Sequence, residues 1–167
     1  MKLLIFVNLI FFSVCFSQKK QSRFAVINSD DYSLEYDKKY FTETDGIGNS
    51  FLLFINDSNK NYIEFLRISS EDLGNYEKMD LEYFSEIREY ALKEEYKILN
   101  KNKDSLNGNE YIDFIYEKET STGNFKSLER LFFYKSKIHK LLFNSSKRDF
   151  EKHLPKVIEV LNSFKFK

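Results

Sequence analysis

Hydrophobic and polar positions alternate or cluster in short segments along this chain, and the pattern predicts an antiparallel sheet. Alternation over 32–36 predicts a strand. Apolar runs at 51–55 and 62–68 predict two strands, and the polar turn at 56–61 joins them into a hairpin. Short connections favour antiparallel pairing of three further predicted strands, at 109–117, 125–134 and 138–143.

The predicted strand at 125–134 is apolar on both of its faces. Leu128, Phe132 and Tyr134 share one parity, and Leu131 and Phe133 share the other. A strand of this kind belongs inside a sheet that is covered on both sides.

After residue 80 the spacing of the apolar residues changes to the period of a helix. Asp80 is a good N-cap, and apolar residues follow it at Leu81, Phe84, Ile87 and Ala91. The opposite side is charged, so we expect an amphipathic helix whose apolar stripe lies on the sheet.

A second helix is predicted near the C-terminus. Ser146 and Asp149 resemble a capping box, and Pro155 is expected to kink the helix. The apolar residues at helical spacing are Phe150, Leu154, Val157, Ile158 and Leu161. The tail at 163–167 alternates and is predicted to pair at a sheet edge. The predicted fold is therefore α+β: an antiparallel β-sheet covered by helices on both faces, an α/β/α sandwich.

The N-terminus has the pattern of a signal peptide. Lys2 precedes an apolar run at 3–12, which is too short to span a membrane. Small residues at Cys15 and Ser17 predict cleavage between Ser17 and Gln18. We therefore predict a signal peptide at 1–17 and a single α+β domain at 18–167, exported to the periplasm or secreted.

Two alternatives to simple cleavage remain at this end of the chain. Lipidation of Cys15 would make a lipoprotein, although Val14 is larger than the residue that normally precedes such a cysteine. The apolar run would otherwise be a buried N-terminal element. No other stretch is long and apolar enough to cross a membrane, so no span is expected after signal removal.

Composition narrows the classes of function. Hydrophobic residues make up 42% of the chain and aromatic residues 17%, which is ample for a core and argues against disorder. Lys and Arg total 26, and Asp and Glu also total 26. This balance gives no electrostatic reason to expect a nucleic acid or an anionic membrane as partner.

The order of elements and two soft motifs resemble a known family. The motifs are Gly108-x-Glu110-Tyr111 at the start of a strand and a last helix that ends at 160–165 in Val-Leu-Asn-Ser-Phe-Lys. Over residues 24–167 the chain resembles the PsbP-like and DcrB-like α/β/α sandwich family of small exported proteins. The resemblance implies an accessory that binds or assembles with another envelope or secreted protein, and it carries over no site residues.

Motifs for chemistry are incomplete. Residues 57–61 begin like a calcium loop, but its sixth and twelfth places hold Tyr62 and Ile68. The glycines at 46 and 48 lack the third glycine of a phosphate loop and precede a strand. His139, placed by alternation in a core or edge position, and His153 have no second ligand at i+3 or i+4. We expect no catalytic, cofactor-binding or metal site, and no enzyme.

Aromatic residues cluster around the first predicted strand, at Tyr32, Tyr36, Tyr40 and Phe41, and some of them are expected to be exposed. A binding surface, if present, is predicted in the 36–50 loop, because loops tend to carry function on such scaffolds. The predicted function is that of an exported, non-catalytic binding or assembly accessory of the cell envelope. The alternatives are a small-ligand carrier and an exported hydrolase.

Overall fold

The computed structural model describes residues 22–45, 50–56, 64–74, 79–121 and 123–167. The predicted signal peptide, its cleavage site between Ser17 and Gln18, the glycines at 46 and 48, and the calcium-like segment 57–61 lie outside the described residues. No helix in the described ranges is long and apolar enough to cross a bilayer.

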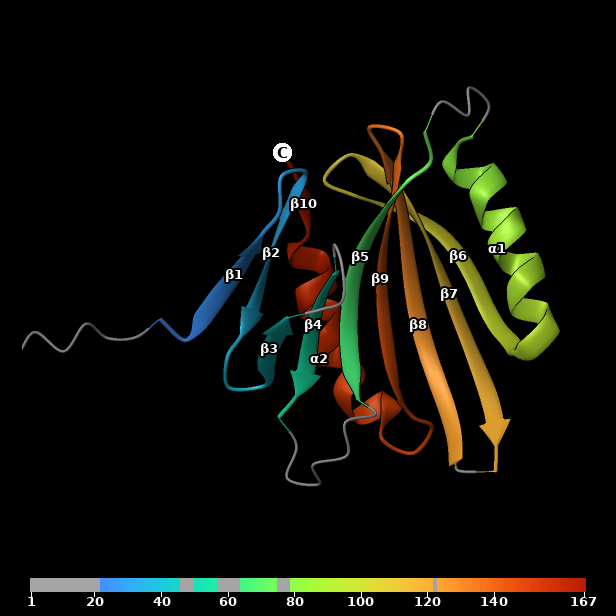
Figure 1. Cartoon of the computed structure of the whole chain (residues 1–167). Coiled ribbons are helices and arrows are strands. Elements are labelled where there is room, and N and C mark those ends of the chain that lie inside the picture. The colour runs from blue at the N-terminus through green and yellow to red at the C-terminus, as the bar shows by residue number, and fades with distance from the viewer. Residues whose placement is uncertain (1–21, 46–49, 57–63, 75–78, 122) are drawn as a thin grey trace, which may run out of the picture.

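Antiparallel strands dominate the described part of the chain (Figure 1). They form a seven-stranded sheet in the order β3-β4-β5-β9-β8-β7-β6 and a three-stranded sheet in the order β1-β2-β10. The strands are β1 Phe24–Asn28, β2 Tyr32–Asp37, β3 Phe41–Asp45, β4 Ser50–Ile55, β5 Phe65–Asp72, β6 Lys97–Leu106, β7 Asn109–Thr120, β8 Gly123–Tyr134, β9 Lys137–Ser146 and β10 Lys165–Phe166. The helices are α1 Leu81–Glu95 and α2 Phe150–Ser163.

The α+β class and its antiparallel sheet, both predicted from the sequence, are confirmed. β4 pairs with β5 as the predicted hairpin, although β5 runs on to Asp72. β8 is an interior strand between β7 and β9, as its two apolar faces predict. The C-terminal tail pairs with β2 through Lys165 and Phe166. Asp80 caps α1, because its carboxylate accepts the Tyr83 N–H at 2.8 Å.

The loop predicted within 36–50 is wrong for residues 41–45. Residues Phe41–Asp45 form β3, which pairs with β4 so that Phe41 lies opposite Ile55. Thr42, Glu43 and Thr44 are exposed polar residues at the edge of the sheet, where charge is tolerated because no further strand pairs there. This polarity is why the strand reads as a loop.

The buried face of α1 also differs from the predicted one. Leu81, Ser85 and Leu92 are buried, whereas Ile87 and Ala91 are exposed. The reason is an ion pair from the inner face of the helix: Arg88 Nε lies 2.6 Å from Oε1 of Glu129 on β8. Keeping this pair fixes how the helix is rotated against the sheet.

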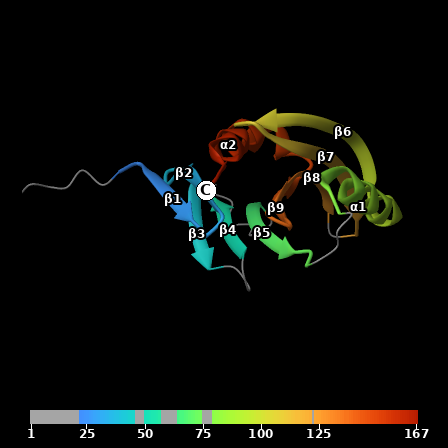
Figure 2. The ribbon, with the colours of Figure 1, turned by 90° about the horizontal axis from the view of Figure 1, so that it is seen from above.

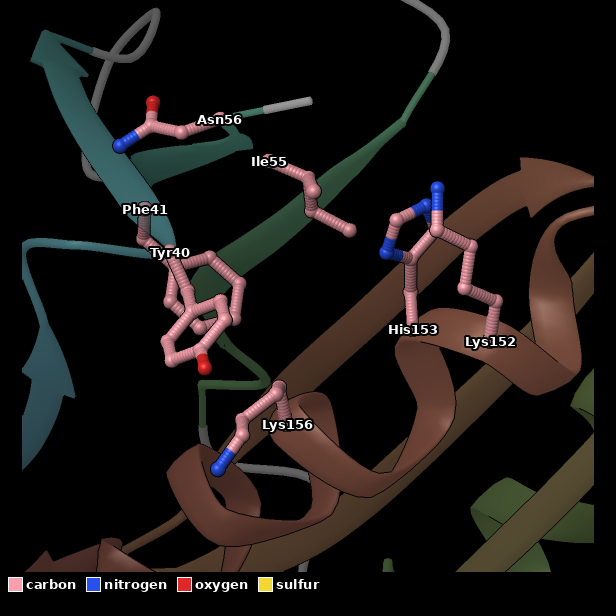
Figure 3. A pocket seen from close by; sticks show the side chains of 7 residues that line it. All are labelled: Tyr40, Phe41, Ile55, Asn56, Lys152, His153 and Lys156. Carbon is pink, nitrogen blue, oxygen red and sulfur yellow. The ribbon is translucent and has the colours of Figure 1, made fainter. Parts of the chain in front are cut away.

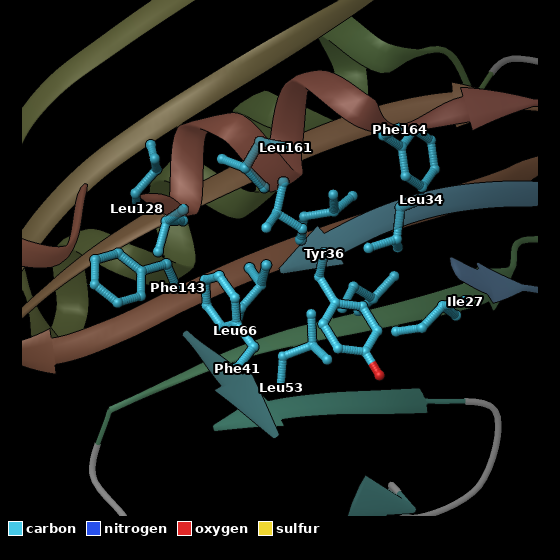
Figure 4. Packing of buried hydrophobic residues seen from close by; sticks show 14 of the residues in the cluster. Ile27, Leu34, Tyr36, Phe41, Leu53, Leu66, Leu128, Phe143, Leu161 and Phe164 are labelled. Atoms are coloured by element: carbon cyan, nitrogen blue, oxygen red, sulfur yellow. The ribbon is translucent and has the colours of Figure 1, made fainter. Parts of the chain in front are cut away.

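Two hydrophobic clusters form the core, one on each face of β8. Leu131 packs in the cluster that contains Leu81 and Leu92 of α1. Its neighbours in the other parity, Leu128 and Phe132, pack in the larger cluster. That cluster also contains Tyr32 and Val157. Figure 4 shows Leu34, Leu66, Phe143, Leu161 and Phe164 of the same cluster. The small sheet therefore shares this core with α2, a layer that the sequence does not predict.

Candidate functional site

A pocket of about 220 Å³ lies between α2 and the residues that flank β3 and β4 (Figure 3). One wall is basic and comes from α2. The other is aromatic, aliphatic and amide in character and comes from the sheet edge. The lining residues are Tyr40, Phe41, Ile55, Asn56, Lys152, His153 and Lys156.

Asn56 fixes the sheet side of the pocket. Its side-chain amide donates to the Lys38 carbonyl at 3.2 Å, and its side-chain oxygen accepts the Thr42 hydroxyl at 2.5 Å. Its backbone N–H donates to the Tyr40 carbonyl at 2.8 Å. These bonds from one residue, with a further one from its amide to the Lys39 carbonyl at 3.4 Å, hold the turn that enters β3 and so orient Tyr40 and Phe41 towards α2.

Helical spacing explains the basic wall. Lys152, His153 and Lys156 lie at i, i+1 and i+4, so they project from one side of α2. The predicted capping box is only partly formed: Ser146 Oγ accepts the Asp149 N–H at 3.2 Å, but the Asp149 side chain makes no cap bond. The Ser146 hydroxyl instead donates to the Asp149 carboxylate at 2.9 Å. The kink predicted at Pro155 stays a prediction.

Charge and ring contacts define what the pocket attracts. Lys156 Nζ lies 5.0 Å from the centre of the Tyr40 ring and 2.6 Å from Glu159 Oε1. The hydrogen bond to Glu159 raises the pKa of Lys156, so this amine is protonated at neutral pH. His153 Nε2 lies 3.1 Å from Glu64 Oε2. The arrangement suits a ligand with one anionic group and an apolar body.

A smaller hollow of about 80 Å³ adjoins the pocket and shares Phe41 and Lys156 with it. Its other side is occupied by paired polar groups. Arg23 Nε donates to Asp37 at 2.7 Å, and this contact lowers the pKa of Asp37. Asp37 is therefore already paired, and the smaller hollow is an extension of the pocket that the carboxylates Glu35 and Glu159 also line.

The aromatic residues singled out in the sequence have different positions. Some of the four are expected from the sequence to be exposed, and the structure buries Tyr32, Tyr36 and Phe41. Tyr40 is half-buried, and with Phe41 it lines the pocket, so the predicted region 36–50 does contribute to it. Sequence reasoning missed the basic wall, whose signal is the i, i+4 pair Lys152 and Lys156 on the polar side of α2.

A serine and a histidine meet away from the pocket. Ser70 Oγ lies 2.8 Å from Nδ1 of His139, which is fully buried as its strand position predicted. Burial lowers the pKa of His139 and keeps its ring neutral. The ring packs edge-on against Tyr32, with centroids 5.6 Å apart. Among the described residues, no group of three or more His, Cys, Asp or Glu side chains is arranged to hold a metal ion.

No protein-family model matches the sequence, and no curated sequence is significantly similar to it. Solved structures do match. Cyanobacterial PsbP (CyanoP) from Synechocystis sp. PCC 6803 superimposes with a TM-score of 0.62 at 11% identity, over 87% of this chain and 93% of its own. A Pseudomonas aeruginosa protein of unknown function, PA94, is described as a putative regulator. It superimposes with a TM-score of 0.59 at 11% identity, over 85% of this chain and 96% of its own.

A Bacteroides thetaiotaomicron structure gives a TM-score of 0.56 at 13% identity, over 88% of this chain and 49% of that one. At such identities the likeness establishes the fold alone. The PsbP-like fold that the sequence resembles is thus confirmed.

Proposed function

We propose that this protein of PsbP-like fold is an exported, non-catalytic accessory of the cell envelope that acts by binding. The observation that carries the proposal is the lining of the α2 pocket. Its described lining residues offer amines, an imidazole, an amide and aromatic rings, whereas the Ser70–His139 pair lies elsewhere. Such a lining is suited to holding a ligand rather than transforming it.

The pocket favours a small carboxylate with an aromatic or aliphatic body. Lys156 and Lys152 would face the carboxylate, while Tyr40, Phe41 and Ile55 would contact the apolar body. Its volume of about 220 Å³ is below the roughly 300 Å³ at which typical ligand sites begin. A compact molecule or a single inserted side chain therefore fits better than a large ligand.

Export supports an accessory role. The sequence pattern at 1–17 predicts a leader, and every described strand and helix lies after residue 22. Removal of the leader would thus leave the fold intact.

We expect the protein purified from its native cell envelope to begin at Gln18 when its N-terminus is sequenced. A chain that still begins at Met1 would contradict export by this signal.

The two helices would cover opposite faces of the large sheet. Glu129 and Arg130 are adjacent on β8, so their side chains point to opposite faces of the sheet. Glu129 pairs with Arg88 of α1, whereas Arg130 donates to Asn162 of α2 at 3.2 Å, which supports one helix on each face. This arrangement leaves the edge strand β3 and the adjacent side of α2 open to a ligand.

Benzoate is a suitable probe of the ligand class. Calorimetry of residues 18–167 with benzoate is expected to give a dissociation constant on the order of millimolar, the range for so small a ligand. Benzyl alcohol has a similar shape without the charge and is expected to bind several-fold more weakly. Lys156→Met should weaken the binding of benzoate. Lys165→Met removes the same charge from an exposed position on β10 and should leave benzoate binding unchanged. Equal binding of both probes, or an unaffected Lys156→Met protein, would contradict the proposed pocket chemistry.

A carrier of a small ligand is the second candidate, and the size and concavity of the same pocket favour it. The two functions differ in what stays bound. A carrier would retain a small molecule through purification from its native envelope, detectable by mass spectrometry after denaturation. An accessory would instead be cross-linked to a protein partner in that envelope.

A further inference from the structure

The outward side of α1 exposes large apolar side chains that the sheet does not use. Tyr83, Ile87 and Tyr90 are 52%, 47% and 71% exposed. They lie at i, i+4 and i+7, so they form one continuous row, called here the α1 stripe. In both views α1 lies at the outer side of the molecule, away from α2 and the small sheet (Figure 1, Figure 2).

The α1 stripe cannot turn inward without breaking the contacts of the inner side. Arg88 makes a bidentate pair with Glu129, at 2.6 Å from Nε to Oε1 and 2.8 Å from Nη2 to Oε2. Leu92 is fully buried beneath the helix. A rotation that buried Ile87 would remove both features, so exposure of the α1 stripe is built into the fold.

Carboxylates beside the α1 stripe are unpaired. Glu86 and Glu94 are exposed, and neither forms an ion pair with any described residue. The other carboxylates of α1 are all paired: Glu82 with Lys103 at 3.6 Å, Glu89 with Lys93 at 2.6 Å and with Lys101 at 3.0 Å, and Glu95 with Lys118 at 2.7 Å. Unpaired negative charge therefore coincides with the exposed aromatic rings.

We propose that the α1 stripe, with Glu86 and Glu94, is the docking site for a basic amphipathic segment of a partner protein. Lysine or arginine side chains would meet the two carboxylates and the tyrosine faces, while apolar residues would cover Ile87. This inference rests on the proposed accessory role and gives the chemistry of its partner.

Other occupants fit the charges less well. An anionic membrane surface would be repelled by Glu86 and Glu94. A symmetric contact with a second copy would set these carboxylates against each other, which is unfavourable. A basic segment is the occupant that satisfies both the charge and the aromatic surface.

The test measures binding of a 14-residue amidated leucine–lysine amphipathic peptide to residues 18–167 by fluorescence anisotropy. An otherwise identical leucine–glutamate peptide is the charge control. We expect the basic peptide to bind and the acidic one not to bind. Glu86→Gln with Glu94→Gln, and separately Tyr83→Ser with Tyr90→Ser, should each weaken binding about tenfold. Because all four side chains are exposed, these variants should fold normally.

Glu71→Gln with Glu119→Gln is the matched control, because it removes the same charge from two exposed positions outside α1. Its affinity for the basic peptide should equal that of the wild type. The proposal is overturned if the wild type does not bind, if the control weakens as much as the α1 variants, or if the acidic peptide binds equally well. Preferential binding to phosphatidylglycerol vesicles would overturn it in favour of a membrane. Benzoate binding should be unchanged in the α1 variants, because no α1 residue lines the pocket, so failure of the pocket and failure of the α1 stripe are distinguishable.

Discussion

Adjacent residues of β8 carry opposite charges into the two cores. Glu129 is fully buried against Arg88 and accepts the Tyr116 hydroxyl at 3.1 Å. Its neighbour Arg130 is nearly as buried and binds Asp113 through two nitrogens, at 2.8 and 2.9 Å. Each charge is compensated within hydrogen-bond distance, because an unpaired charge in such a place would be very costly.

Removing one member of the buried pair should therefore be destabilising. Glu129→Gln leaves the Arg88 guanidinium facing a neutral group, and we expect a loss of about 3 kcal/mol in the free energy of unfolding. Urea denaturation measures this change. Glu119→Gln, an exposed position on β7, should stay within about 0.5 kcal/mol of the wild type. Equal effects at both positions would mean that the Arg88–Glu129 pair is not an essential part of the core.

His139 makes stability depend on pH. Burial lowers its pKa below the ordinary value of 6.5, so the unfolded chain binds a proton more readily than the folded one. The stability contributed by the neutral ring is complete above pH 6.5 and is lost as pH falls below that value. His139→Gln should flatten the fall in unfolding free energy between pH 7.5 and pH 5.5. An unchanged slope would show that other groups cause it.

At the scale of elements, α1 illustrates what a periodic pattern can and cannot predict. Its existence and its cap at Asp80 follow from local sequence. Its rotation does not, because the apolar residues at Ile87 and Ala91 extend the helical stripe as well as Leu92 does. The partner that decides the rotation, Glu129, lies 41 residues from Arg88 along the chain.

The rotation of α1 is tested by a pair of substitutions. Leu92→Ala should cost about 2–5 kcal/mol, because it leaves a cavity beneath a fully buried side chain. Ile87→Ser should change stability by no more than about 0.5 kcal/mol, because Ile87 faces solvent. Thermal or urea unfolding reports both values. The reverse order would favour the face predicted from the sequence.

Edge strands are the elements that sequence reasoning missed. β6 reads Lys-Ile-Leu-Asn-Lys-Asn-Lys-Asp-Ser-Leu and pairs only with β7, with a register shift between Ile98 and Asn100. β3 is equally polar beyond Phe41. Each of these two strands pairs on one side only and carries few apolar residues, so neither shows the apolar pattern that predicts β2 and β8.

At the scale of the whole molecule, the pocket joins segments that are about a hundred residues apart in sequence. Tyr40 and Asn56 enclose one side, and His153 and Lys156 enclose the other. Locally, the lysines of α2 resemble a solvated helix face, and no motif links them to β3. The antiparallel class could be predicted from short-range pattern, whereas the pocket depends on long-range pairing such as that of β5 with β9.

The pocket and the α1 stripe have no residue in common, so the proposed ligand site and the proposed docking site are separate surfaces. A partner on α1 would leave the pocket open.

The most direct test of the binding site is an NMR titration of ¹⁵N-labelled residues 18–167 with benzoate. We predict saturable shifts at the backbone amides of Tyr40, Ile55, Asn56 and His153, which disappear in Lys156→Met and persist in Lys165→Met. The amides of α1 should not move. Shifts confined to another part of the protein, or shifts that Lys156→Met leaves unchanged, would contradict the assignment of the α2 pocket as the binding site.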